Sequence, residues 1–492
     1  MTCCVAAISV FVSCEKDPVI HSDQNRAYQN LFAYTYMSQA YVWADEIKNE
    51  LDSWKTSFYD DASKVDPIET VSRIRHKYDR WTLVTEDFDA LVNSVQGIST
   101  TFGFILRFYI SRTDGSVIAV VLCTYKDSPA EKVGLKRGDY ITSVNGISLT
   151  TSNYESVYYN EINGGISCLF TVCDNITGEK REINLSPVEM YQEPVMLAKV
   201  FDVAGKKVGY LLYDSFTLES IDNLKLVMRS FAQAGVSELI LDMRYNLGGY
   251  VTAEIALATM LAPKSVIGDE KGSGGAVYQK LVYNSLQSSK YKDEDMQYRF
   301  AQVLKDSNGN EYYNVSGLNL DLKKVYAIMT SNSASASEAI LVGLAPYLDV
   351  EIIGQSKSEG SRYCSQGKFC QGTLNSAEDF IEYNRSVFED DYDDALSALD
   401  NWGIYVMNAR YTDCNGNCPI MPDGFAADIL SVDNPLDGAA LGDQEETMLK
   451  AALQCAAGSP ATKCHQGARP LDDTFAPADF QPFSPSILVD FR

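Results

Sequence analysis

The stretch KKVYAIMTSNSASASEAILVGLAPYL, residues 323–348, joins a strand-like apolar run to a helix-like apolar run through a turn in which serine and alanine alternate. Ser335 and Glu338 have the spacing of a capping box, in which the two side chains satisfy free N–H groups at the start of a helix. The same position suits a nucleophile, because the N–H groups and the dipole of a helix N-terminus stabilise developing negative charge. The spacing is compatible with both interpretations.

Strand-like and helix-like segments alternate on both sides of this turn. In chain order they read KVGYLLYDSF, IDNLKLVMRSFAQAG, SELILDMRYNLGGY, TAEIALATML and VEIIG. Such alternation predicts parallel strands and an α/β core. Ligands bind beyond the carboxyl ends of the strands in these sheets. We therefore expect the turns at residues 246–249 and 333–337 to face one cleft.

The length of 492 residues favours two or three domains. Apolar positions three or four residues apart predict a helical N-terminal domain over residues 15–98. The segment SAEDFIEYNRSVFEDDYDDALSALDN ends an acidic stretch, residues 364–401, that we interpret as a solvated insertion into the core. Residues 459–492 have the proline content of an irregular tail. Together these features predict a multidomain α/β protein.

The charge balance argues against nucleic acids and anionic membrane surfaces as partners. The formal net charge is −25, and 46% of the residues are hydrophobic. Such an acidic surface repels the phosphates of nucleic acids and the face of an anionic membrane. The sequence therefore predicts a globular protein that binds no nucleic acid.

The first fourteen residues, MTCCVAAISVFVSC, form a short apolar run. It is shorter than the roughly 20 residues that span a bilayer, and it has the length of a signal-peptide apolar region. Its Ser-Cys ending resembles a bacterial lipoprotein signal, which implies lipid modification of Cys14. The localisation implied is the bacterial envelope, periplasmic or in the outer membrane, with a lipid anchor as the membrane contact. A buried N-terminal strand is the alternative interpretation.

Cysteines occur in close pairs, which makes them disulfide candidates if the chain is exported to an oxidising compartment. The pairs are Cys364 with Cys370, Cys414 with Cys418, and Cys455 with Cys464. A structural zinc site would need four converging ligands, and only one histidine, His465, lies near any of these pairs. We expect no metal site.

The segment DSPAEKVGLKRGDYITSVNGISLT, residues 127–150, resembles the signature of a PDZ domain. The upstream TFGFIL resembles the carboxylate-binding loop of that fold, formed here by Phe102, Gly103 and Phe104. The resemblance implies a β-rich, peptide-binding domain over residues 99–187. PDZ domains bind peptide C-termini by adding a strand to a sheet edge.

Three further motifs follow the PDZ-like segment: LDMRYNLGG, SASASE and VEIIG. In this order they resemble the C-terminal processing, or tail-specific, serine proteases, a resemblance that covers residues 99–458. It implies an α/β peptidase core over residues 188–458 with a mainly parallel sheet. It also implies cleavage of peptides or protein C-terminal regions through an acyl-enzyme, without a cofactor.

The resemblance assigns roles to individual residues. The nucleophile of the family falls on Ser335, and the oxyanion is held by the N–H groups of Gly248 or Gly249 and of Ala336. Judged from the residues alone, the glycine pair is equally suited to a tight strand-to-helix turn. A phosphate-binding loop is not indicated, because the G-x-x-x-x-G-K-[ST] pattern does not occur.

A serine needs a base to remove its proton, and the base of the family is a neutral lysine. Its aligned position is Gly360, or Ser361 after a one-residue insertion. Lys357 lies three residues before Gly360, and Lys368 lies eight after it. We take Lys357 as the candidate base, which requires burial to lower its pKa from about 10.4. The alternative is a non-catalytic relative that binds peptides through its PDZ domain.

Overall fold

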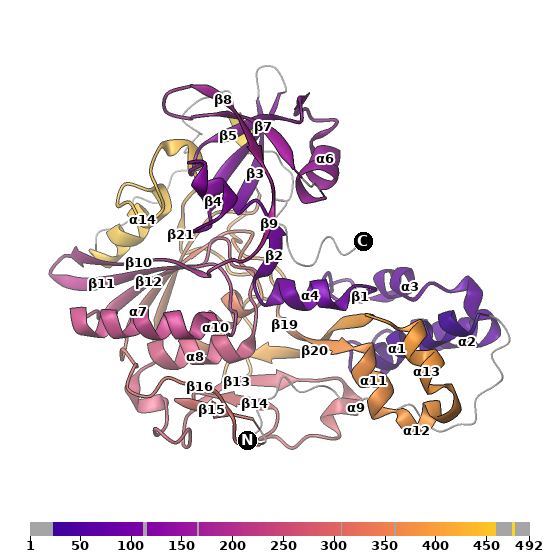
Figure 1. Cartoon of the computed structure of the whole chain (residues 1–492). Coiled ribbons are helices and arrows are strands. Elements are labelled where there is room, and N and C mark those ends of the chain that lie inside the picture. Colours follow the sequence, from indigo (N-terminus) through magenta and orange to yellow (C-terminus); the bar gives the residue numbers. More distant parts are fainter. Residues whose placement is uncertain are drawn as a thin grey trace.

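The structure is a computed structural model that describes residues 23–111, 116–164, 167–306, 308–358, 361–458 and 475–477. The predictions for Cys14, Gly360 and Cys464 concern residues outside these ranges. Within them, no helix has both the length and the apolar character required to cross a membrane. The expected multidomain α/β architecture, with N-terminal helices and a PDZ domain, is confirmed (Figure 1).

A six-stranded sheet forms the centre of the α/β core, in the order β10-β11-β12-β17-β18-β21. Its strands are β10 (Val195–Val203), β11 (Lys206–Tyr213), β12 (Glu238–Asp242), β17 (Lys324–Met329), β18 (Asp349–Gly354) and β21 (Ile429–Leu430). The pair β10–β11 is antiparallel, and the four remaining pairs are parallel. The strand–helix alternation in the sequence thus predicts the pairing correctly.

Helices cover both faces of this sheet because its strands are apolar on both sides. Three helices pack on one face: α7 (Ser220–Ala234), α8 (Val251–Leu261) and α10 (Ala336–Leu344). Leu239 and Leu241 of β12 point to that face, whereas Ile240 points to the other, where α14 (Thr447–Ala456) packs. Figure 1 shows α7, α8 and α10 together beneath the sheet.

A second sheet connects the core to a helical domain. It contains β1 (Leu83–Thr85), β13 (Val277–Val282), β14 (Gln297–Arg299), β19 (Cys370–Ser376) and β20 (Gly403–Thr412). The helical domain contains α1 (Gln24–Gln39), α2 (Lys48–Asp61), α3 (Pro67–Ile74), α11 (Ala377–Tyr383), α12 (Arg385–Phe388) and α13 (Tyr392–Ala398). Shorter elements are α4 (Phe88–Val95), α9 (Ser285–Ser288), β15 (Val303–Lys305) and β16 (Glu311–Asn314).

The interpretation of the acidic stretch as a solvated insertion is wrong for its apolar residues. Phe380 and Phe388 are buried, and Phe380 packs edge-on against Phe32 of α1 with the ring centroids 5.4 Å apart. The acidic side chains of α13 share their helix with the buried Ala395 and Ala398. The helices of the insertion therefore pack against the N-terminal helices, and the two sets share one hydrophobic core.

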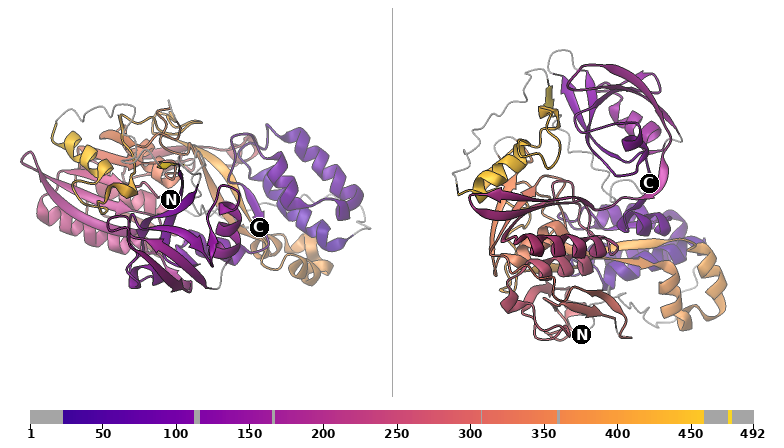
Figure 2. Two further views of the ribbon diagram at one scale, coloured as in Figure 1. Left: turned by 90° about the horizontal axis from the view of Figure 1, so that it is seen from above. Right: turned by 60° about the vertical axis from the view of Figure 1, so that its left-hand side comes forward.

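The PDZ domain is an antiparallel sheet with short helices. Its strands are β3 (Phe104–Ser111), β4 (Val117–Thr124), β5 (Tyr140–Val144), β6 (Ile147–Ser148), β7 (Cys168–Cys173) and β8 (Lys180–Leu185). The helices are α5 (Pro129–Lys132), α6 (Tyr154–Val157) and a π-helix over Tyr158–Asn163. The strands β2 (Ile98–Thr101) and β9 (Val188–Tyr191) pair with each other at the boundary of this domain. Figure 2 shows the domain beside α14.

One strand from the C-terminal part of the chain extends the PDZ sheet. The backbone of β22 (Phe475–Pro477) pairs antiparallel with β3, and Ala476 lies opposite Ile110.

The candidate disulfides between Cys364 and Cys370 and between Cys414 and Cys418 are not formed in the structure, where all four residues are free thiols. Cys364 lies against Gly354 at the end of β18, and its Sγ donates to the Phe425 carbonyl at 3.4 Å. Cys370 instead begins β19 of the second sheet. The two cysteines are close in sequence, but Cys364 lies against the core sheet and Cys370 belongs to the second sheet.

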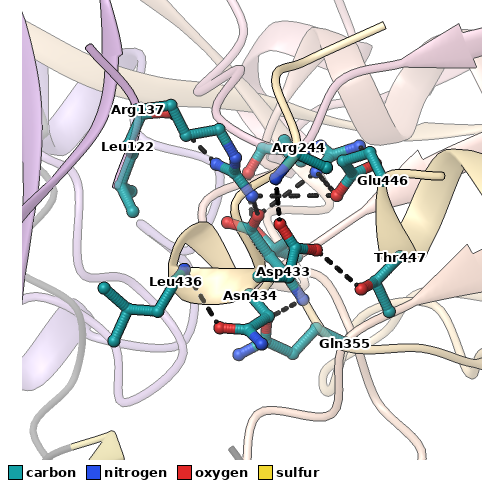
Figure 3. A network of polar contacts seen from close by, with 12 residues as sticks. Leu122, Arg137, Arg244, Gln355, Asp433, Asn434, Leu436, Glu446 and Thr447 are labelled. Carbon is teal, nitrogen blue, oxygen red and sulfur yellow. Dashed lines mark hydrogen bonds and ion pairs between the residues drawn. The ribbon is translucent and has the colours of Figure 1, made fainter. Parts of the chain in front are cut away.

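A buried ionic network joins the PDZ domain, the core sheet and the segment before α14 (Figure 3). Arg244, two residues after the end of β12, contacts Asp242 at 2.7 Å, Glu446 at 2.8 Å and Asp433 at 3.2 Å. Arg137 of the PDZ domain contacts Asp433 at 2.6 Å. Burial alone would raise the pKa of Asp433, but the neighbouring guanidinium groups hold it well below its usual range.

The network predicts a large loss of stability in Arg244→Met. The substitution leaves Asp242, Glu446 and Asp433 buried with less positive charge, and breaking such a cluster costs about 3–5 kcal/mol. The control is Arg385→Met, which removes an exposed ion pair with Glu382 worth about 1 kcal/mol or less. Urea unfolding of both variants measures the difference. Similar losses in the two variants would contradict this account of the network.

Candidate active site

Ser335 occupies the N-cap of α10, at the turn that follows β17. Its backbone has φ 57° and ψ −120°, a conformation that is rare for a residue with a side chain and that recurs at functional sites. The predicted capping box is present, and the Ser335 N–H donates to Glu338 Oε2 at 3.2 Å. The serine side chain retains slight exposure, at 9% for the residue. Capping is thus compatible with a reactive hydroxyl.

Glu338 does more than cap the helix. Its fully buried carboxylate accepts hydrogen bonds from Ser365 Oγ at 2.5 Å, Gly367 N–H at 2.7 Å and Lys368 N–H at 2.9 Å. Burial raises the pKa of Glu338, and these hydrogen bonds act in the opposite direction. The carboxylate therefore fastens the loop at residues 365–368 to the start of α10.

The two turns expected to share a cleft are in direct contact. A Cβ added at Gly248 would lie 2.6 Å from Ser335 Cβ and 3.0 Å from the Ala336 nitrogen, so only glycine allows this approach. Gly248 and Gly249 have φ of 107° and 139°, which also favours glycine. The Ala334 N–H donates to the Asn246 carbonyl at 3.1 Å and connects the turns.

The N–H groups expected to hold an oxyanion differ in their present partners. The Gly248 N–H donates to Asn246 Oδ1 at 2.8 Å. Among the described residues, no acceptor contacts the N–H of Gly249 or of Ala336. Ala336 is the first residue of α10, where a helical N–H has no intrahelical partner. Gly249 and Ala336 therefore have N–H groups that an incoming oxygen could use.

A cavity of about 30 Å³ lies beside Ser335. Its lining residues come from α8, α10 and the second sheet with the adjoining turns: Gly249, Val251, Glu254, Gln279, Ser335, Ala336, Ala339, Gln371, Gly372, Tyr405 and Tyr411. The cavity is thus lined by the serine, by the two residues whose N–H groups could bind an oxygen, and by a residue with a carboxyl group.

That carboxyl group, Glu254 of α8, was not predicted from the sequence. It is 1% exposed, and its Oε1 accepts hydrogen bonds from Tyr278 Oη at 2.7 Å and Gln279 Nε2 at 2.9 Å. Burial raises the pKa of Glu254 to about 8. The available signal was a single acidic residue in the otherwise apolar and small-residue segment TAEIALATML.

The two lysines near the expected base position lie in different surroundings. Lys357 is an exposed residue, so the burial expected of the base is not found, and its Nζ donates to the Asp423 carbonyl at 2.5 Å. Local desolvation of the ammonium group and the nearby Arg80 still lower the pKa of Lys357. No hydrogen bond joins Lys357 to Ser335 in the described chain. Ser361 is half-buried, and its hydroxyl accepts from the Tyr363 N–H at 3.1 Å.

Lys368 is buried and lies closer to the cavity wall. Its Nζ donates to Tyr405 Oη at 3.1 Å, and Tyr405 lines the cavity. The ammonium lies 5.5 Å from the ring centroid of Trp81 and 5.0 Å from that of Tyr405.

The predicted carboxylate loop of the PDZ domain is tied to the start of α5. A Cβ at Gly103 would lie 2.0 Å from Ser128 Cβ, and the Gly103 carbonyl accepts from Ser128 Oγ at 3.2 Å. Phe102 is buried in the PDZ core, and the half-buried Phe104 stacks on it with the centroids 5.7 Å apart. The loop is therefore held in a fixed shape.

The buried Glu254 predicts a pH-dependent stability. Its pKa is about 8 in the folded chain, against an ordinary value of 4.5. The protonated carboxyl therefore contributes fully below about pH 4.5, and its contribution is lost as the pH rises through 8. This group alone should lower the free energy of unfolding by up to about 1.4 kcal/mol per pH unit in that window.

Chemical unfolding at about pH 6 and about pH 8.5 checks this prediction in the unmodified protein and in Glu254→Gln. The amide keeps the shape of the side chain and does not ionise, so the variant should lose less stability on the same change of pH. An equal loss in both proteins would show that Glu254 does not titrate in this range.

Two family matches cover this architecture. Residues 207–431 match Peptidase family S41, and residues 120–158 match the PDZ domain family. The putative S41 protease from Bacteroides fragilis NCTC 9343 has the same fold, with a TM-score of 0.60 and 20% identity over 87% of this chain and 97% of that one.

Curated relatives match over part of the chain. The carboxy-terminal processing protease CtpB of Bacillus subtilis strain 168 is 27% identical over 165 residues, 33% of this chain and 32% of that protein. The chloroplastic carboxyl-terminal-processing peptidase 1 of Arabidopsis thaliana is 31% identical over 170 residues, 33% of each chain. The matched part thus spans about a third of the length of these relatives. Residues 207–431 of the chain thus resemble the core of peptidase family S41, and residues 120–158 resemble a PDZ domain.

Proposed function

We propose that the protein is a serine-type peptidase that cleaves peptides or the C-terminal regions of proteins. One observation carries the proposal: Ser335, in a strained conformation at a helix N-terminus, lines a cavity together with Gly249 and Ala336. Such strain is retained where surrounding structure enforces it, and it is common at active sites.

In the proposed reaction, Ser335 Oγ attacks the carbonyl carbon of the scissile peptide, and a base accepts the hydroxyl proton. The carbonyl oxygen becomes an oxyanion that accepts hydrogen bonds from Ala336 N–H and from Gly249 or Gly248 N–H. Collapse of this intermediate breaks the C–N bond, and the leaving amine takes up the proton. Water then hydrolyses the acyl-enzyme at the same carbonyl.

Lys357 is the proposed base. Its lowered pKa supports this role, because a lysine must be neutral to accept a proton. Its hydrogen bond to the Asp423 carbonyl would have to break as the loop at residues 355–358 moves toward Ser335. Lys368 is the rival lysine, and its Nζ donates to Tyr405 Oη.

Peptide turnover tests both assignments. We expect Ser335→Ala and Lys357→Ala to lose at least about 100-fold in kcat, the usual scale for a nucleophile or a proton acceptor, while Lys368→Ala keeps measurable activity. In the unmodified protein the rate should rise with pH as the base loses its proton. Full activity in Lys357→Ala would remove Lys357 from the mechanism. No turnover in the unmodified protein would favour the second candidate function.

That second candidate is a non-catalytic peptide-binding protein. The observation in its favour is that neither Lys357 nor Lys368 hydrogen-bonds to Ser335 among the described residues. In both functions the loop at Phe102, Gly103 and Phe104 is proposed to bind the carboxylate of a peptide C-terminus. Peptides that end in an amide should then bind more weakly than the acids, and equal affinities would argue against carboxylate recognition.

The proposed setting is the bacterial envelope, with the chain anchored through lipid on Cys14. The support is the signal-like run that ends at Cys14. Intact-mass analysis of protein from a bacterial host should show the lipid, and an unmodified chain that extends upstream of Cys14 would refute the anchor.

A further inference from the structure

The wall of the cavity beside Ser335 contains two side-chain oxygen atoms that form no hydrogen bond within the described part of the chain. Both hydrogen bonds to the Glu254 side chain are accepted by Oε1. The Gln279 side chain donates through Nε2 to Glu254 Oε1 and to the Ala339 carbonyl at 2.8 Å. Glu254 Oε2 and Gln279 Oε1 therefore have no hydrogen-bond partner among the described residues, although both residues line the cavity.

The protonation state of Glu254 makes these two atoms complementary to a hydroxyl group. With a pKa raised to about 8, the carboxyl is protonated at neutral pH. Because Oε1 already accepts two hydrogen bonds, the proton is expected on Oε2, which becomes a donor. Gln279 Oε1 is an acceptor. One side-chain hydroxyl could accept from Glu254 and donate to Gln279.

The size of the cavity limits what can enter. Its volume of about 30 Å³ admits roughly two water molecules, because one buried water needs about 10–15 Å³ of such space. It therefore suits a side chain of about two heavy atoms. Leucine or phenylalanine would require the walls to move, and interiors packed at crystal density resist such movement.

We propose that Glu254 and Gln279 form the floor of the subsite for the residue that supplies the scissile carbonyl, and that this subsite selects serine. The inference rests on the proposed function. A carbonyl held by Gly249 and Ala336 would lie at the rim of the cavity, and the side chain on the adjoining Cα would enter it. Glu254 and Gln279 are then specificity-determining residues for the peptidase.

Binding measurements on Ser335→Ala protein test the subsite without requiring turnover. The probes are fluorescent peptides that differ only at this position, with serine, alanine, 2-aminobutyrate or leucine. Amidated C-termini reduce binding to the PDZ domain. Aminobutyrate replaces the hydroxyl of serine by a methyl group at nearly the same size, so it isolates the contribution of the hydrogen bonds.

We expect the serine peptide to bind about five- to tenfold more tightly than the alanine and aminobutyrate peptides, as one or two net hydrogen bonds allow. The leucine peptide should bind most weakly. Glu254→Met in the same background should remove the advantage of serine, whereas Glu254→Gln should retain most of it, because its amide also donates into the cavity. Thermal unfolding shows whether each variant is folded.

Equal binding of the serine and aminobutyrate peptides would overturn the proposal, and this comparison needs no substitution at Glu254. Preferred binding of leucine, or no binding of any peptide, would also overturn it. Selective binding by Ser335→Ala combined with no turnover in the unmodified protein would support the subsite and reject the peptidase. Turnover in the unmodified protein without selective binding of the serine peptide would support the peptidase and reject the subsite.

Discussion

The close approach of two strand-to-helix turns is the constraint on which the candidate site depends. Gly248 lies so near Ser335 and Ala336 that a single added carbon would clash at 2.6 Å. Parallel pairing of β12 with β17 brings the turns to the same edge of the sheet, and positive φ at both glycines allows the chain to turn there. The N–H groups beside the serine are thus arranged by backbone geometry.

Two buried carboxyl groups hold the surroundings of this turn. Glu338 binds the loop at residues 365–368 to the start of α10, and Glu254 connects α8 to Tyr278 and Gln279 of the second sheet. A third element, Arg244, follows β12 and joins the sheet to Asp433 and Glu446. Because Arg137 shares Asp433, the PDZ domain is bound to the same cluster. Hydrogen bonds and ion pairs between buried groups of this kind fix one arrangement of neighbouring elements.

Local patterns in the sequence predict the parts of this structure that depend on local rules. Strand–helix alternation gives the parallel core, and the spacing of Ser335 and Glu338 gives the cap. The role of Glu338 toward the loop at residues 365–368 could not be predicted, because its partners are about 30 positions away in sequence. The burial of Phe380 and Phe388 likewise depends on α1, more than 300 residues earlier. The burial of Glu254 could not be predicted either, because it depends on contacts with Tyr278 and Gln279 of the second sheet.

The proposed role of Ser335 is that of a nucleophile activated by its position at the start of α10. Reaction with a fluorophosphonate, followed by peptide mass spectrometry, tests it most directly. We expect a single adduct on Ser335, and much slower labelling in Gly248→Ala, because the added methyl group displaces the serine. No adduct, or an adduct on another serine with Ser335 unmodified, would contradict the account.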